Sequence, residues 1–170
     1  VYQKDGSYRE RHSGTFLWHA EHVHYHFADF VIYELTSEDS PLSDVLDDAA
    51  QKSTFCIRDV SKVSLELPNT PDDAEYRVCG RERQGISVGW GDTYFFTYPD
   101  QNLDVTGLPT GRYRLTFDVN PEDRFDEIRL DNNISSALLD IDMEAKTVTV
   151  VEVEPENSPT VEHIYEEQTL

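Results

Sequence analysis

The chain has 170 residues and a formal net charge of −20, which comes from 34 acidic residues against 14 lysines and arginines. Its length permits one globular domain with a core of moderate size. The charge argues against nucleic acid or an anionic membrane as a partner, and no apolar run reaches the roughly 18 residues of a membrane span. An acidic surface can steer cationic amines, or it can solvate a protein in high salt. The second interpretation explains the overall charge better and does not exclude the first.

Short β-branched and aromatic runs between clusters of Gly, Pro, Asp and Asn predict an all-β fold. Their spacing is typical of a β-sandwich with long loops and little helix. The expected strands, in chain order, are Thr15–Trp18, His22–Leu35, Ser53–Ile57, Asp92–Thr97, Arg112–Val119, Ala137–Ile141 and Lys146–Glu154. One short helix or turn is expected over 40–50, and the last two strands form a hairpin that turns at 142–145.

Both ends of the chain carry expectations of their own. Residues 155–170 are acidic, contain proline and lack periodicity, so we expect a mobile tail after a single domain of residues 1–154. The sequence begins at Val1 without a basic n-region or an apolar h-region, which leaves a processed chain or a fragment as the alternatives.

Three histidines alternate at His22, His24 and His26, just before an apolar, β-branched run. Alternation along a strand would place all three imidazoles on one face. Three converging imidazoles suit Cu(II) or Zn(II) and suit Mg or Ca poorly, because these ions prefer oxygen. The alternative is a histidine-rich strand with solvated or packed rings. The metal site is favoured because half of the chain's six histidines lie within five positions.

Cys56 and Cys79 are the only cysteines, and they lack CxxC spacing. A disulfide that closes the loop between them is the simplest interpretation, and two unpaired buried cysteines are the alternative. A disulfide would place the protein outside the cytoplasm, in the extracellular space or at the cell surface.

The histidine segment carries a resemblance to a known family. Trp18-His19-x-x-His22-x-His24-Tyr25-His26 resembles the copper-binding segment of the lysyl oxidases, the copper-dependent protein-lysine 6-oxidases. Further segments extend the resemblance, in order, over roughly residues 15–140. Lys52-Ser53-Thr54-Phe55-Cys56, together with Asp59, resembles the family's precursor-lysine segment, and residues 84–94 resemble its precursor-tyrosine segment. The remaining matching segments are 101–106, 111–113, 120–121 and 131–133.

The resemblance implies a copper- and quinone-dependent amine oxidase. Its Cu(II) ligands would be His22, His24 and His26, and its cofactor, lysine tyrosylquinone, would form from Lys52 and Tyr94. The implied reaction is the oxidative deamination of peptidyl lysine or small alkylamines by O2, which gives an aldehyde, ammonia and hydrogen peroxide. A non-catalytic, secreted β-sandwich that binds copper or zinc through the same histidines is the alternative. The presence of both precursor residues favours the oxidase.

Other residues have implied or candidate supporting roles. His19 is expected to orient a copper ligand without binding the metal itself. Asp92 and Asp104 are candidates for the catalytic base because they lie near the tyrosine segment, and surface carboxylates are the alternative for both.

The chain also departs from the family pattern. Glu21, Trp90 and Asp100 stand where animal members carry cysteines, which indicates a prokaryotic-type member with one disulfide. The resemblance also implies strands before the histidine segment, which we expect this sequence to lack. In the family's calcium segment Arg129 replaces the second acid, although Asp131 could compensate. The possible calcium ligands are therefore Glu127, Asp131, Asn132 and Asn133.

Overall fold

The computed structural model describes residues 7–39, 51–95, 98, 102–127 and 129–154, without the side chains of Gln51 and Lys52. The helix expected over 40–50 and the tail expected over 155–170 lie outside this part. Eight strands and no helix are found among the described residues, so the all-β prediction is confirmed. A search of the same residues for a helix long and apolar enough to cross a membrane finds none.

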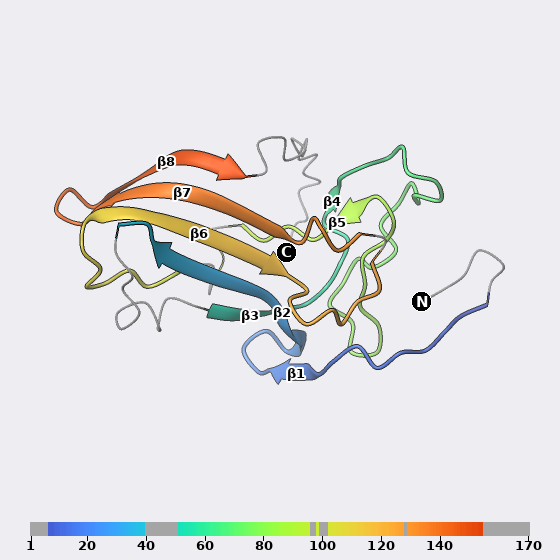
Figure 1. The fold of residues 1–170 in the computed structure, drawn as a ribbon. Helices are drawn as coiled ribbons and strands as arrows, with labels where there is room; N and C mark the ends of the chain where they lie inside the picture. The colour runs from blue at the N-terminus through green and yellow to red at the C-terminus, as the bar shows by residue number, and fades with distance from the viewer. Residues whose placement is uncertain (1–6, 40–50, 96–97, 99–101, 128, 155–170) are drawn as a thin grey trace. The chain divides into compact units, whose positions relative to one another are not determined.

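The strands form two antiparallel sheets (Figure 1). The larger sheet has the order β1-β2-β6-β7-β8, with β3 also paired to β2, and the smaller one contains β4 and β5. A face-to-face sandwich stays a prediction. The strands are β1 (Phe16–His19), β2 (His24–Ser37), β3 (Gln51–Phe55), β4 (Ser61–Lys62), β5 (Trp90–Gly91), β6 (Gly111–Val119), β7 (Ile134–Asp142) and β8 (Thr147–Glu154).

Two predicted strands are partly wrong. The strand predicted from His22 begins at His24, because residues 20–23 form a turn in which Val23 has a positive φ of 57°. The strand predicted over Asp92–Thr97 is absent from residues 92–95, and 96–97 lie outside the described part. In residues 92–95, hydrogen bonds made by the side chains of Asp92, as acceptor, and Tyr94, as donor, take the place of a backbone ladder. The short strands β4 and β5 were not predicted.

The chain divides into two compact units, which we describe separately. The first comprises Val1–Thr15, Ala28–Thr54 and Leu103–Glu156, and the second comprises Phe16–Phe27, Phe55–Asn102 and Asn157–Leu170.

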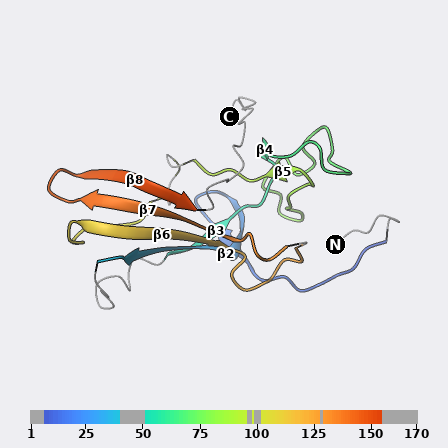
Figure 2. The same ribbon diagram turned by 45° about the horizontal axis from the view of Figure 1, so that its top comes forward.

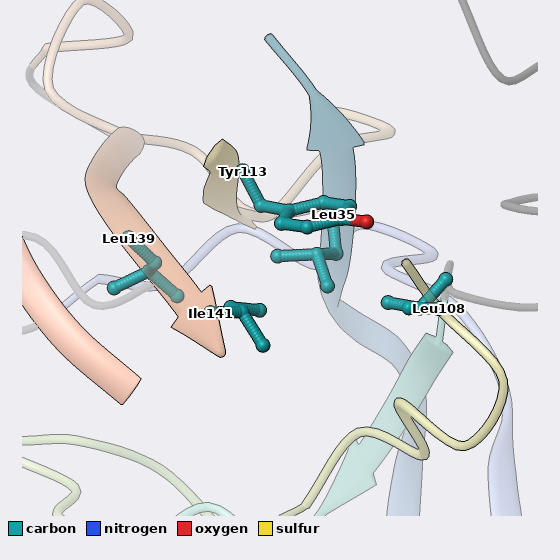
Figure 3. Packing of buried hydrophobic residues seen from close by; sticks show 5 residues of the cluster. All are labelled: Leu35, Leu108, Tyr113, Leu139 and Ile141. Atoms are coloured by element: carbon teal, nitrogen blue, oxygen red, sulfur yellow. The ribbon is translucent and has the colours of Figure 1, made fainter. Parts of the chain in front are cut away.

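The core of the first unit lies on one face of β2, β6 and β7. Five buried side chains point toward one another there: Leu35, Leu108, Tyr113, Leu139 and Ile141 (Figure 3). The register explains the cluster, because β6 pairs Tyr113 with Leu139 and alternate residues of a strand share a face. The Tyr113 hydroxyl donates to the carbonyl of Pro109 at 2.6 Å, so its polar end is satisfied within an apolar cluster.

The predicted hairpin between the last two strands is present (Figure 2). The Asp142 carboxylate closes its turn by accepting the backbone N–H groups of Glu144 and Ala145, at 3.0 and 2.9 Å. Aspartate commonly starts turns in this way, since its side chain substitutes for a backbone acceptor.

The second unit has little regular structure and is organised around a buried carboxylate, Asp59. Its Oδ2 accepts the backbone N–H groups of Glu75 (2.9 Å) and Tyr76 (3.1 Å) and the Ser87 hydroxyl (2.7 Å). Its Oδ1 accepts the Ser87 N–H at 2.7 Å. One side chain therefore replaces a ladder as the connection between segments that are far apart in sequence.

A disulfide joins Cys56 to Cys79 in the same unit, with a Cα–Cα distance of 5.7 Å and a sequence separation of 23. Closing a loop of that length restricts the unfolded chain, which stabilises the folded state by about 3 kcal/mol on the chain-entropy estimate. Disulfides are typical of proteins that fold in oxidising compartments.

Reduction of this disulfide should lower the free energy of unfolding by about 3 kcal/mol. Urea denaturation of the oxidised and reduced proteins measures the difference. A thiol titration of the denatured, unreduced protein should detect no free cysteine. Two thiols that react without reductant would contradict the bridge.

Candidate metal centre

Four imidazoles converge at the start of β2. His24 and His26 lie on the strand, and His22 lies in the turn before it. The antiparallel register places His19 of β1 directly opposite His24, which brings His19 to the same face of the sheet. The predicted ligands, His22, His24 and His26, are therefore brought together by a turn and one strand, and His19 joins them from β1.

The ring nitrogens have the separations of metal ligands. His26 Nε2 lies 3.0 Å from His24 Nε2 and 3.3 Å from His22 Nδ1. A metal ion with M–N bonds of about 2.0–2.1 Å holds adjacent nitrogens about 2.9–3.4 Å apart, so both distances fit a shared ion. A ring nitrogen carries one proton or one lone pair, and His26 Nε2 has two nitrogen neighbours. A bound ion would replace these close nitrogen–nitrogen contacts with metal–nitrogen bonds.

The ring of His19 packs against the other histidines of the cluster. It stacks on the rings of His22 and His26, with centroid distances of 4.1 and 4.6 Å. One ring nitrogen each of His19, His22 and His26 lies within 4.8 Å of the others, and His19 Nδ1 is buried without a hydrogen-bond partner among the described residues. His19 can therefore orient a ligand or contribute a fourth nitrogen, and its supporting role stays a prediction.

The surroundings of His24 favour a neutral ring. Burial lowers the pKa of His24, and the charges of neighbouring His22, His19 and Arg58 lower it further. Metal binding requires the neutral imidazole, so a lowered pKa reduces competition from protons near neutral pH.

Cys56 lies beside both the histidine cluster and the predicted precursor tyrosine. The sulfur atoms of Cys56 and Cys79 and a ring nitrogen of His24 all lie within 4.8 Å of one another. The carbonyl of Cys56 accepts a hydrogen bond from the Tyr94 hydroxyl at 2.7 Å. Cys56 therefore adjoins a candidate ligand through its sulfur and holds the Tyr94 hydroxyl through its main-chain carbonyl.

Tyr94 is held in a mainly apolar setting. Its ring packs against that of Phe55, with centroids 4.4 Å apart. Burial raises the pKa of Tyr94, and the nearby Asp92 raises it further, so the hydroxyl stays protonated at neutral pH. Lys52 lies on β3, and its side chain lies outside the described residues. The pairing of Lys52 with Tyr94 stays a prediction.

Gln84 connects β2 to the segments around Ile57 and Gly80, and no local sequence pattern predicted this role. Its amide nitrogen donates to the carbonyls of Tyr25 (2.7 Å) and Gly80 (3.2 Å), while its oxygen accepts the N–H of Ile57 at 3.1 Å. It opens the segment 84–94 that resembles the family's tyrosine segment, which was the only signal available.

The two candidate bases differ sharply in their surroundings. Asp104 belongs to the first unit, where its carboxylate accepts the N–H of Thr106 at 2.9 Å at the surface. Asp92 belongs to the second unit; its Oδ2 accepts the N–H of Arg58 at 3.3 Å, and its Oδ1 is buried without a partner among the described residues. Burial raises the pKa of Asp92 to about 7, which is where a general base works best.

The raised pKa of Asp92 gives a stability prediction with a defined sign. Because the folded pKa exceeds the unfolded value of 3.8, the contribution to stability is full below about pH 4 and is lost as pH rises through about 7. Asp92→Asn, which keeps the acceptor for Arg58 but cannot ionise, should be more stable than the wild type at pH 8, on the order of 3 kcal/mol. The gain should shrink toward pH 5. Urea denaturation at both pH values measures it, and an equal difference at both would contradict the assignment.

Comparison with known proteins places the chain in a family. The family model described as lysyl oxidase matches residues 6–152. The chain belongs to the lysyl oxidase family. Chicken (Gallus gallus) protein-lysine 6-oxidase is 33% identical over 120 residues, which cover 69% of this chain and 26% of the chicken protein. Zebrafish (Danio rerio) lysyl oxidase homolog 3B is 32% identical over 124 residues, covering 72% of this chain and 14% of that protein.

A third relative, protein-lysine 6-oxidase of pig (Sus scrofa), is 32% identical over 121 residues, covering 69% of this chain and 43% of the pig sequence. This lysyl oxidase family member therefore matches less than half the length of each of these relatives. The histidine donor set fits the copper implied by the family, since all the converging atoms are imidazole nitrogens.

The segment that resembles the family's calcium site lies in the first unit. Glu127 Oε1 accepts the side-chain amides of Asn133, at 3.0 Å, and Asn120. Asp131 pairs with Arg129 at 2.9 Å, and Asn132 is exposed. Amide groups thus engage Glu127 Oε1, and a guanidinium engages Asp131 in place of a cation. Calcium stays a prediction that these contacts do not support.

The structure describes two of the three positions that lack a family cysteine. Trp90 donates its indole N–H to the carbonyl of Pro71 at 3.1 Å, and Lys62 lies over its ring, 5.3 Å from the centroid. Glu21 is exposed in the turn before β2. Asp100 lies outside the described residues.

Proposed function

We propose that this chain is a copper- and quinone-dependent amine oxidase of prokaryotic type that acts outside the cytoplasm. The observation that carries the proposal is the convergence of His22, His24 and His26 in the same unit as half-buried Tyr94, which lies in the segment that resembles the family's precursor-tyrosine segment. The reaction would be the oxidative deamination of a primary amine by O2, with peptidyl lysine or small alkylamines as substrates.

Each residue has a distinct task in this proposal. The three histidines would hold Cu(II), with His19 against two of the rings. Tyr94 and Lys52 would supply the two halves of lysine tyrosylquinone. When bound, copper supplies the oxidising chemistry that builds the quinone, and the quinone supplies a carbonyl and an electron sink for the amine.

Asp92 is the favoured base. Its pKa of about 7 leaves a large fraction ionised at neutral pH, so that it can accept a proton from the carbon next to the amine. Its unpartnered Oδ1 is the atom that would take the proton. The charge of −20 supports an amine substrate, because an acidic surface attracts cations before they bind.

The test is peptide mapping after exposure of the protein to copper and oxygen. A cross-linked peptide that joins the Lys52 and Tyr94 segments should appear, together with amine-dependent release of hydrogen peroxide. Both signals should vanish in Tyr94→Phe, which lacks the hydroxyl, and in Lys52→Arg, which keeps the charge but cannot form the same adduct.

Amine oxidation that survives in Tyr94→Phe would refute this chemistry. Copper or zinc binding without any cross-link in the wild type would favour a metal-binding module that uses the same histidines.

A further inference from the structure

Arg58 differs from every other arginine of the chain. Nine of the ten arginines have a carboxylate or an aromatic ring as partner. Arg58 is half-buried, and its guanidinium forms no hydrogen bond or ion pair with any residue that the structure describes. A guanidinium has five N–H donors, and leaving them unpaired away from bulk water is costly.

The position of Arg58 places it within the candidate site. Its backbone N–H bonds to Asp92 Oδ2 at 3.3 Å, and it follows by two residues the Cys56 carbonyl that holds Tyr94. Its charge also acts on His24, Asp92 and Tyr94. Burial is the largest influence on the pKa of all three groups, and the Arg58 charge contributes a downward shift to each. One cation therefore acts on a candidate ligand, the favoured base and the precursor tyrosine.

Among the described residues, no carboxylate forms an ion pair with this cation. The Asp92 carboxylate contacts Arg58 only through the main chain, because its Oδ2 accepts the Arg58 N–H. Burial also raises the pKa of Asp92 to about 7. The chain has 34 acidic residues, and eight of its other arginines form ion pairs with acidic side chains. A half-buried guanidinium without such a pair among the described residues keeps its N–H donors for the carboxylate of a ligand.

We propose that Arg58 binds the carboxylate of a substrate that carries both a primary amine and a carboxylate, such as free lysine or an ω-amino acid. The proposal rests on the proposed function for the amine end of the substrate. The planar guanidinium matches a carboxylate in two parallel hydrogen bonds. An ω-amino acid has no net charge and free lysine has one net positive charge at neutral pH, so the acidic surface repels neither of them.

The first measurement separates anion binding from catalysis. Hexanoate has the carboxylate but no amine, so its binding to the copper-loaded protein, followed by titration calorimetry, does not depend on turnover. Arg58→Gln should weaken hexanoate binding at least tenfold, by about the strength of a charge-assisted pair. Arg58→Lys should retain part of it, since lysine keeps the charge without the fork. The control is Arg112→Gln, an exposed arginine already paired with Asp140 at 2.7 Å, which should bind hexanoate as the wild type does.

The second measurement compares 6-aminohexanoate with hexylamine, which have the same chain length. The wild type should show the higher kcat/KM with 6-aminohexanoate, and the ratio of the two values should fall in Arg58→Gln. If no amine is oxidised but hexanoate binding still depends on Arg58, the oxidase proposal fails and the anion site stands. If folded Arg58→Gln binds hexanoate as tightly as the wild type, or if the wild type does not bind it, the anion site is refuted.

Discussion

Replacing His26 with alanine should abolish stoichiometric copper binding. Its Nε2 is the atom that both His22 and His24 approach, at 3.3 and 3.0 Å, and its side chain is the most buried of the three, with a residue exposure of 6%. Losing a residue that merely orients a ligand costs about 10–100-fold in metal affinity, so loss of this central ligand should exceed that range. Elemental analysis after dialysis measures the copper content.

The controls use the other histidines. His22→Ala and His24→Ala should also lower copper content sharply, whereas His12→Ala should not, because His12 is exposed in the first unit. His19→Ala should weaken binding by about 10–100-fold if His19 positions the rings that it stacks on. Full copper occupancy in the His26→Ala protein would show that the cluster is not the copper site.

Replacing Asp59 with alanine should destabilise the second unit by at least about 3 kcal/mol. The change leaves three backbone N–H groups and the buried Ser87 hydroxyl without their acceptor, and a single unsatisfied buried donor costs about 1–3 kcal/mol. Urea unfolding, followed by a probe in this unit such as tryptophan fluorescence, measures the loss.

The matched control is Asp73→Ala in the same unit. Asp73 is exposed and lies 3.8 Å from exposed Arg77, so its removal should change stability by less than about 1 kcal/mol. Equal midpoints for Asp59→Ala and Asp73→Ala would show that the Asp59 network does not organise the unit.

The sequence predicted the first unit better than the second, for physical reasons. The strands at 111–119 and 147–154 carry long apolar and β-branched runs, and their predicted and observed bounds differ by one residue or less. The predicted strand at Asp92 has similar composition, but Asp92 and Tyr94 bond to the segment around Cys56. Local periodicity contains no information about such distant partners.

The metal site shows the same limit at the level of single residues. Alternation identified His22, His24 and His26, although the turn at Val23, not a continuous strand, presents the first of them. His19 joins the cluster through the β1–β2 register, which spacing along the chain did not reveal. Arg58 could not be singled out at all, because its distinguishing property is the lack of a side-chain partner among the described residues, and that is visible only in the folded chain.

The position of Cys56 has a consequence for the order of maturation. Its sulfur adjoins His24, and its carbonyl holds the Tyr94 hydroxyl. Oxidation of the two thiols during folding thus fixes the backbone on which both groups depend. If copper reached the reduced chain first, the two soft thiols beside His24 would compete with the imidazole nitrogens for the metal. The bridge removes that competition, so thiol oxidation should precede metal loading, and metal loading should precede any modification of Tyr94.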